Sequence, residues 1–81
     1  MAKKEYYFSD HYHKEREPYV SKGLVLDCIH HGQRKLEEYP NKFMSRKAFN
    51  RGELMVVFME FDEYFYIITA FWNVRGDKYE I

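Results

Sequence analysis

The chain has 81 residues, which is enough for one domain and too few for two. Hydrophobic residues make up 46% of it and aromatic residues 20%, a composition that excludes a wholly disordered protein. Lys plus Arg and Asp plus Glu each number 13, so the net charge is zero, which argues against a strongly basic nucleic-acid binder but leaves a local basic patch open.

The charge is distributed unevenly along the chain. Residues 1–52 hold 11 Lys/Arg and seven Asp/Glu, whereas residues 53–81 hold two and six, so the halves carry net charges of +4 and −4. The single cysteine, Cys28, excludes an internal disulfide. The charged start leads into no apolar run of signal-peptide length, and the longest apolar stretches are too short to span a bilayer as helices. We therefore expect a cytoplasmic protein without membrane association.

Two short helices are predicted in the N-terminal half, after a brief strand at residues 6–8. Ser9 or Asp10 is the expected N-cap of the first helix, which continues to about Glu17, where Pro18 ends it. The second helix is predicted over residues 23–31, with Ser21 as its N-cap and Gly32 as a left-handed C-cap. It carries one apolar stripe at helical spacing, made of Leu24, Val25, Cys28 and Ile29. Cys28 on this stripe is interpreted as a buried structural thiol.

A segment over residues 34–39 follows and ends at the break Pro40-Asn41. From there the chain reads as strands over residues 43–49, 54–61 and 64–72, separated by turn signals at Asn50–Gly52 and Asp62-Glu63. The last segment is predicted to be a central strand because both of its faces are largely apolar. Simple alternation places Phe65, Ile67, Thr69 and Phe71 on one face, and Tyr64, Tyr66, Ile68 and Ala70 on the other.

This order predicts an α+β fold, in which a short N-terminal strand and two helices pack on a three- to four-stranded antiparallel meander. The chain is expected to form a single domain with its core at about residues 6–72. A polar tail is expected over residues 73–81.

The sequence carries four motifs: Phe8-Ser9-Asp10-His11, Lys22-Gly23-Leu24, Arg51–Val57 and Tyr66–Phe71. Together they resemble a family of short prokaryotic proteins classed as a domain of unknown function. That family has a Ser-x-His start, an Arg-Gly-Ile before the main helix and an ending like Val-Ile-Thr-Ala-Tyr. The ending is also similar to that of BrnT-type toxins, and the layout is similar to the RelE toxin superfamily.

The resemblance covers about residues 6–72 and implies a metal-independent endoribonuclease that acts on RNA without a cofactor and has a cognate antitoxin as partner. His11 would transfer a proton during cleavage, since a histidine has a pKa near neutrality. Its alternative role is that of a surface or capping histidine. Lys22 stands where the family has arginine and would contact the substrate.

Basic residues on the strand at 43–49 and in the hairpin after it are the next candidates. Arg46 and Arg51 would hold the scissile phosphate and stabilise the charge of the transition state. Arg46 and Lys47 point to opposite faces of a strand, so only one of them can line a given site. The alternative is a solvated sheet face with charges that protect the sheet edge.

Tyr66 and Trp72 are candidates for stacking on bases, and their alternative is the core or an interface. The histidine pairs His11/His13 and His30/His31 lack the spacing of a metal site. The first pair would lie on the same side in a strand but not in a helix, and the adjacent side chains of the second pair point in different directions. We therefore expect no metal.

Two other functions stay open: a non-catalytic protein-interaction module of the same fold, and a degenerate toxin. A homodimer or a hetero-complex would cover exposed apolar strand surface.

Overall fold

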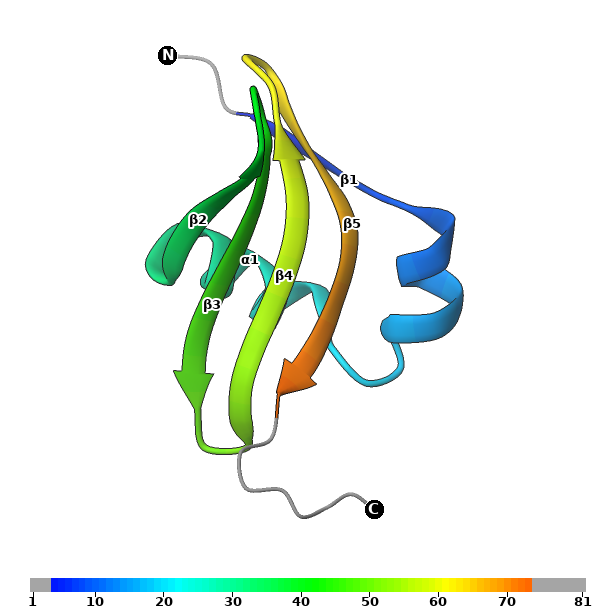
Figure 1. Cartoon of the computed structure of the whole chain (residues 1–81). Coiled ribbons are helices and arrows are strands. Elements are labelled where there is room, and N and C mark those ends of the chain that lie inside the picture. Colours follow the sequence, from blue (N-terminus) through cyan, green and yellow to red (C-terminus); the bar gives the residue numbers. More distant parts are fainter. Residues whose placement is uncertain (1–3, 74–81) are drawn as a thin grey trace.

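The computed structural model describes residues 4–73. In chain order the elements are β1 (Glu5–Phe8), the π-helix η1 (Tyr12–Arg16), α1 (Lys22–His31), β2 (Gln33–Glu38), β3 (Lys42–Phe49), β4 (Gly52–Glu60) and β5 (Tyr64–Asn73). One sheet of five strands is formed, in the order β1-β5-β4-β3-β2. The helix α1 crosses one face of this sheet, behind it in Figure 1, and the blue helical turn η1 lies beside β5.

The N-terminal strand belongs to the sheet. β1 runs parallel to β5, with Tyr6 opposite Phe65, and all other neighbouring strands are antiparallel. The predicted α+β class is confirmed, and so are a four-stranded meander and the central place of β5, between β1 and β4. The prediction that the N-terminal strand packs on the meander is wrong, because β1 is hydrogen-bonded to β5, the last strand of the meander, and so extends the same sheet.

Serine side chains start both helical segments, as predicted. Ser9 Oγ accepts a hydrogen bond from the N–H of Tyr12 at 3.0 Å, and Ser21 Oγ accepts one from the N–H of Leu24 at 3.4 Å. The first segment widens into a π-helix, in which the N–H of Glu17 reaches the carbonyl oxygen of Tyr12 at 2.8 Å.

Gly32 ends α1 by a different route from the predicted left-handed cap. Its backbone is extended, with φ −90° and ψ −176°, so the expectation of positive φ is wrong. A Cβ at this position would lie 2.5 Å from the carbonyl oxygen of Arg46 and 2.6 Å from that of Cys28. Glycine is therefore required for space, because α1 passes directly into β2 against the backbone of β3.

The hairpin between β3 and β4 follows the predicted turn. Gly52 has φ 154°, which is unfavourable for any residue with a side chain. Asn73 is the last residue of β5, and the rest of the expected polar tail, residues 74–81, lies outside the described residues.

Within residues 4–73, no helix is long and apolar enough to cross a bilayer.

The core lies between α1 and the sheet. The predicted helical stripe is buried at Val25, Cys28 and Ile29. It meets buried side chains from β4, from β5, from η1 and from the segment between η1 and α1: Tyr12, Val20, Leu54, Val56, Phe58, Phe65, Ile67 and Ala70. Burial raises the pKa of the Cys28 thiol to about 11, so the thiolate needed for nucleophilic chemistry is disfavoured. The interpretation of Cys28 as a buried thiol is confirmed.

A β-bulge at Ile68 changes the face on which the end of β5 presents its side chains. Phe58 pairs with Ile67 and Val57 pairs with Thr69, so Ile68 is an extra residue. The Oγ of Ser9 donates a hydrogen bond to the Ile68 carbonyl oxygen at 2.6 Å and so satisfies one of its acceptor positions.

The predicted alternation of β5 is therefore wrong beyond Ile67. Phe65 and Ile67 face α1, and they are followed on that face by Ala70 and Trp72. Thr69 and Phe71 lie on the opposite face instead, beside their β4 partners. One extra residue reverses the face of every later side chain in a strand.

Candidate functional site on the open face of the sheet

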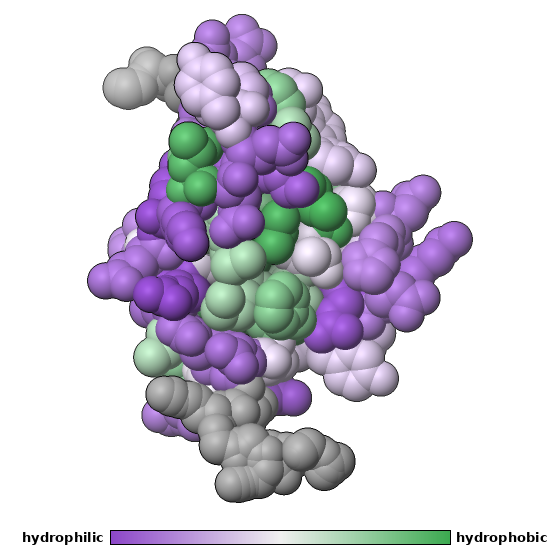
Figure 2. Space-filling view, viewed as in Figure 1, coloured by the Kyte–Doolittle hydropathy of each residue, from purple (hydrophilic) through white to green (hydrophobic). Residues whose placement is uncertain are grey.

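The face of the sheet opposite α1 has no helix over it in the described part of the chain. Cross-strand pairing places half-buried apolar side chains on its central strands, because directly opposite residues share a face. Apolar side chains gather in the middle of this face, bordered by polar ones (Figure 2). We call this surface the open face; its apolar centre consists of Met44, Met55, Val57, Met59 and Phe71.

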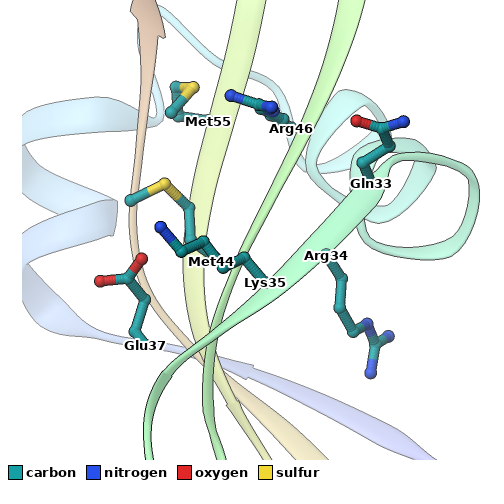
Figure 3. A pocket seen from close by; sticks show the side chains of 7 residues that line it. All are labelled: Gln33, Arg34, Lys35, Glu37, Met44, Arg46 and Met55. Carbon is teal, nitrogen blue, oxygen red and sulfur yellow. The ribbon is translucent and has the colours of Figure 1, made fainter.

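A hollow of about 360 Å³ lies on the β2 side of the open face. Met44 and Met55 line it beside Gln33, Lys35 and Arg46, whereas the side chain of Arg34 points away from them (Figure 3). Methionine side chains adapt their shape to a ligand and contact aromatic rings favourably. The hollow thus combines an adaptable apolar surface with cationic groups.

The cations of the open face are loosely held. The Arg46 side chain is 55% exposed, and its Nε lies 3.8 Å from the Glu53 carboxylate. Lys42 likewise lies 3.8 Å from Glu38. Exposed pairs at such distances contribute little, so both cations remain available to an incoming anion. Glu37 and Glu53 keep the total charge of the hollow and its surroundings near balance.

Tyrosine side chains occupy the β1 side of the open face. Tyr66 is 37% exposed and lies opposite Met59, and Tyr7 lies opposite Tyr66. The rings of Tyr7 and Tyr64 contact each other edge to face, with centroids 5.5 Å apart. A hydrogen bond from the Tyr7 hydroxyl to Glu5, together with the charge of that carboxylate, raises the pKa of Tyr7. The three tyrosines present exposed side chains on this part of the open face.

Of the predicted site residues, Arg46 and Tyr66 share the open face. Lys47 points to the α1 side, where its Nζ donates a hydrogen bond to Asp27 at 2.9 Å. The predicted opposite orientation of Arg46 and Lys47 is thus confirmed. Trp72 also lies on the α1 side, and its Nε1 donates to the carbonyl oxygen of Tyr19 at 3.2 Å.

The remaining predicted residues lie outside the open face. Lys22 starts α1, 3.8 Å from Glu17 and above the ring of Phe8. Arg51, in the β3–β4 hairpin, has its guanidinium 5.0 Å from the centre of the Trp72 ring.

His11 is exposed at the start of the helical segment after β1. Two strands, β5 and β4, separate β1 from the strand that carries Arg46. The structure therefore does not gather His11, Arg46 and Arg51 into one cluster. His11 and His13 lie in the first helical segment, as predicted, where residues two positions apart do not face the same side.

Lys35, Met44 and Met55 were not among the residues predicted from the sequence. The signal that could have revealed them is the hairpin signal at Asn50–Gly52, because a tight turn there fixes the register of β3 on β4. That register places Met55 opposite Arg46, and Met44 follows on the same face.

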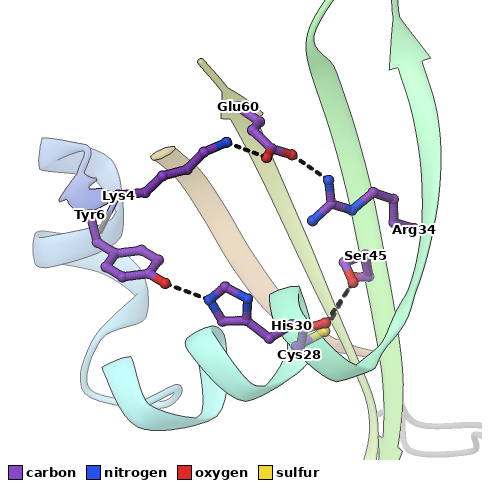
Figure 4. Close-up of polar contacts among 7 residues, drawn as sticks. All are labelled: Lys4, Tyr6, Cys28, His30, Arg34, Ser45 and Glu60. Atoms are coloured by element: carbon purple, nitrogen blue, oxygen red, sulfur yellow. Dashed lines mark hydrogen bonds and ion pairs between the residues drawn. The ribbon is translucent and has the colours of Figure 1, made fainter. Parts of the chain in front are cut away.

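A second polar cluster covers the aromatic end of the core on the α1 side. Glu60 bridges Lys4 and Arg34 (Figure 4). The charged group of Lys4 lies over the ring of Phe65, and that of Arg34 lies over the ring of Phe58. Partial burial raises the pKa of Glu60, but hydrogen bonds from Lys4 and Arg34 outweigh it, and the net pKa is lowered. The charges of this cluster are paired with one another, because the Glu60 carboxylate contacts both Lys4 and Arg34.

The hydroxyl of Tyr6 contacts His30 Nε2 beside this cluster (Figure 4). The Tyr6 ring stacks on Phe65, with centroids 5.2 Å apart. These contacts fix the C-terminal turn of α1 against β1 and β5.

Within residues 4–73, no group of three or more His, Cys, Asp or Glu side chains is arranged to hold a metal ion. Comparison of the chain with protein-family models, with curated proteins and with solved structures gave no match.

Proposed function

We propose that this chain is a RelE/BrnT-like protein that acts on RNA and holds it on the open face of the sheet. The observation that carries the proposal is the presence of exposed tyrosines and loosely paired cations on one sheet face, which no helix covers within residues 4–73 (Figure 1). The order of strand, helical turn, helix and meander agrees with the layout of the family that the sequence resembles.

The proposed contacts follow from the chemistry of single-stranded RNA. Unpaired bases stack on aromatic rings, and Tyr66 and Tyr7 present adjacent rings for this purpose. Arg46 is available to form a forked pair of hydrogen bonds with a phosphate. The methionines of the hollow would accept a base through contacts with its face. A balanced charge implies that stacking contributes much of the affinity.

Cleavage requires more than this surface. In the toxin hypothesis His11 transfers a proton, and Arg46 and Arg51 stabilise the phosphate. Arg51 and His11 lie away from the hollow, so RNA bound along the sheet would have to pass its edge to reach them. Binding and cleavage are therefore tested as separate properties.

Binding is tested by fluorescence anisotropy with a labelled single-stranded RNA of mixed sequence. Arg46→Ala and Tyr66→Ala should each weaken binding about 5- to 100-fold, the equivalent of roughly 1–3 kcal/mol for one stacked base or charged contact. Lys14→Ala is the matched control, since Lys14 is an exposed cation that lies on η1 and not on a strand of the sheet. Equal losses in the control and in Arg46→Ala would show non-specific attraction and would refute the surface.

Cleavage is tested by induced expression in a bacterial host and by incubating the purified protein with the same RNA. A toxin should arrest growth, and His11→Ala and Arg51→Ala should relieve the arrest while they still fold. Growth that continues normally with the wild type, together with intact RNA, would exclude the nuclease and leave RNA binding to stand on the anisotropy data.

A protein-interaction module is the second candidate, and the Met-rich apolar centre of the open face favours it. Its partner would be an apolar segment of another protein, such as a cognate antitoxin. Substituting Met55→Glu should abolish capture of such a partner, whereas Arg46→Ala should change it little. If RNA binding fails and this pattern is found, the interaction module is the correct function.

A further inference from the structure

β2 forms one edge of the sheet, and its outer side is open in the described part of the chain. All six of its residues are exposed, and among residues 4–73 it pairs with β3 alone, with a shift of register between Leu36 and Glu38. An edge strand of this kind presents a row of backbone N–H and C=O groups to any strand that approaches.

The other edge of the sheet presents a shorter row of free backbone groups. β1 has only four residues, and the part of β5 that extends beyond it is covered by the chain that follows β1. Ser9 Oγ donates to the carbonyl oxygen of Ile68 at 2.6 Å, and Arg16 Nε donates to that of Ala70 at 2.7 Å. The edge of β2 is therefore the place where a further strand can pair with the sheet.

The charges of β2 reverse sign at its centre. Arg34 and Lys35 precede Leu36, and Glu37 and Glu38 follow it. Leu36 is itself 47% exposed, although it is a large apolar residue. Lys35 and Glu37 take part in none of the ion pairs found among residues 4–73. Both line the hollow of the open face, so they lie on the same side of the strand (Figure 3).

We propose that two copies of this chain pair through β2, antiparallel and about a twofold axis at Leu36. In this register Leu36 lies opposite Leu36 of the second copy, and Lys35 lies opposite Glu37 of the second copy at two equivalent places. A twofold interface must be self-complementary, and the sign reversal at Leu36 supplies that property. Charges on an edge strand usually prevent pairing, but opposite charges directly across a strand pair stabilise it.

The dimer joins two five-stranded sheets into one continuous sheet. The two open faces then adjoin along β2, and the hollows that contain Lys35 and Arg46 lie on both sides of the axis. This inference does not depend on RNA binding, because it rests on the edge of the sheet and not on its face.

Sedimentation of the full chain over a range of concentrations tests the proposal. The wild type should be a dimer, and Lys35→Glu should raise the dimer dissociation constant about tenfold or more, because it places like charges opposite each other at both sites. Lys35→Glu combined with Glu37→Lys restores opposite charges in exchanged positions and should restore the dimer. Lys14→Glu makes the same charge change on η1 and should leave the dimer intact.

Circular dichroism of each variant ensures that a lost dimer is not an unfolded protein. A wild type that sediments as a monomer at all concentrations overturns the proposal. A dimer that Lys35→Glu leaves unchanged, or that the double exchange fails to restore, shows that the copies associate through another surface and overturns it equally.

Discussion

Ser45 and Cys28 exchange hydrogen bonds between the sheet and the helix. The Ser45 hydroxyl donates to the Cys28 carbonyl oxygen at 2.6 Å (Figure 4), and the Cys28 thiol donates to the Ser45 carbonyl oxygen at 3.4 Å. Both residues are fully buried, so the pair is shielded from water. It fixes the position of α1 along β3, and through β3 it fixes the neighbouring hollow of the open face.

The substitution Ser45→Ala should lower the free energy of unfolding by about 1 kcal/mol, which is the usual net contribution of one hydrogen bond. The loss stays modest because the Cys28 carbonyl oxygen keeps its bond from the N–H of Gly32 at 2.9 Å. Urea unfolding measures the change, and Ala48→Ser, at an exposed position of the same strand, gives the Ala–Ser difference to subtract. No remaining difference would mean that this pair does not stabilise the fold.

Gly32→Ala should destabilise the protein by about 1–3 kcal/mol or more, because its Cβ would be forced against two backbone carbonyl oxygens. Gly23→Ala is the matched substitution, since a Cβ there would have no neighbour within 4 Å. It lies within α1 and should stabilise the protein by about 0.5–1 kcal/mol. Thermal unfolding of both variants should therefore shift in opposite directions, and a stable Gly32→Ala protein would contradict the close approach.

Stability should decrease in acid partly through Glu60. Its folded pKa is lowered below the ordinary 4.5, so its contribution is complete above pH 4.5 and is lost as the pH falls through the lowered pKa. Glu60→Gln removes this carboxylate, and the dependence of its unfolding free energy on pH should be flatter in that range. Glu63→Gln, in the exposed turn before β5, should leave the dependence as in the wild type. Identical acid dependence in Glu60→Gln and the wild type would contradict the bridge to Lys4 and Arg34.

The parts of the fold that depend on local signals could be predicted from the sequence. Capping serines, the apolar stripe of α1 and the turn at Asn50–Gly52 each act over a few residues. The parallel pairing of β1 with β5 joins residues about 60 positions apart, and no local signal encodes it. The bulge at Ile68 also has a distant partner, the hydroxyl of Ser9, which donates to its carbonyl oxygen.

The candidate site divides in the same way. Alternation within one strand correctly separated Arg46 from Lys47. Which predicted residues share a face depended on the sheet order and on the bulge, and neither was accessible from periodicity. Trp72 therefore lies toward α1, although simple alternation along β5 placed it with Tyr66.

Tyr12→Phe should alter stability in alkali. Burial, together with the negative charge of Glu17, raises the pKa of Tyr12 from 10.0 to about 12. Its neutral form is thus favoured in the folded state, and its contribution is complete below pH 10.0 and is lost as the pH rises through about 12. In Tyr12→Phe this loss should disappear.

At neutral pH the same variant should be less stable by about 1–3 kcal/mol, because the buried carbonyl oxygen of Val20 loses the Tyr12 hydroxyl that donates to it at 2.5 Å. Urea unfolding at a series of pH values measures both effects together. Tyr19→Phe is the control, since Tyr19 is 61% exposed and should behave like the wild type. A Tyr12→Phe protein that is as stable as the wild type at pH 7 would show that the hydroxyl does not anchor the first helical segment on Val20.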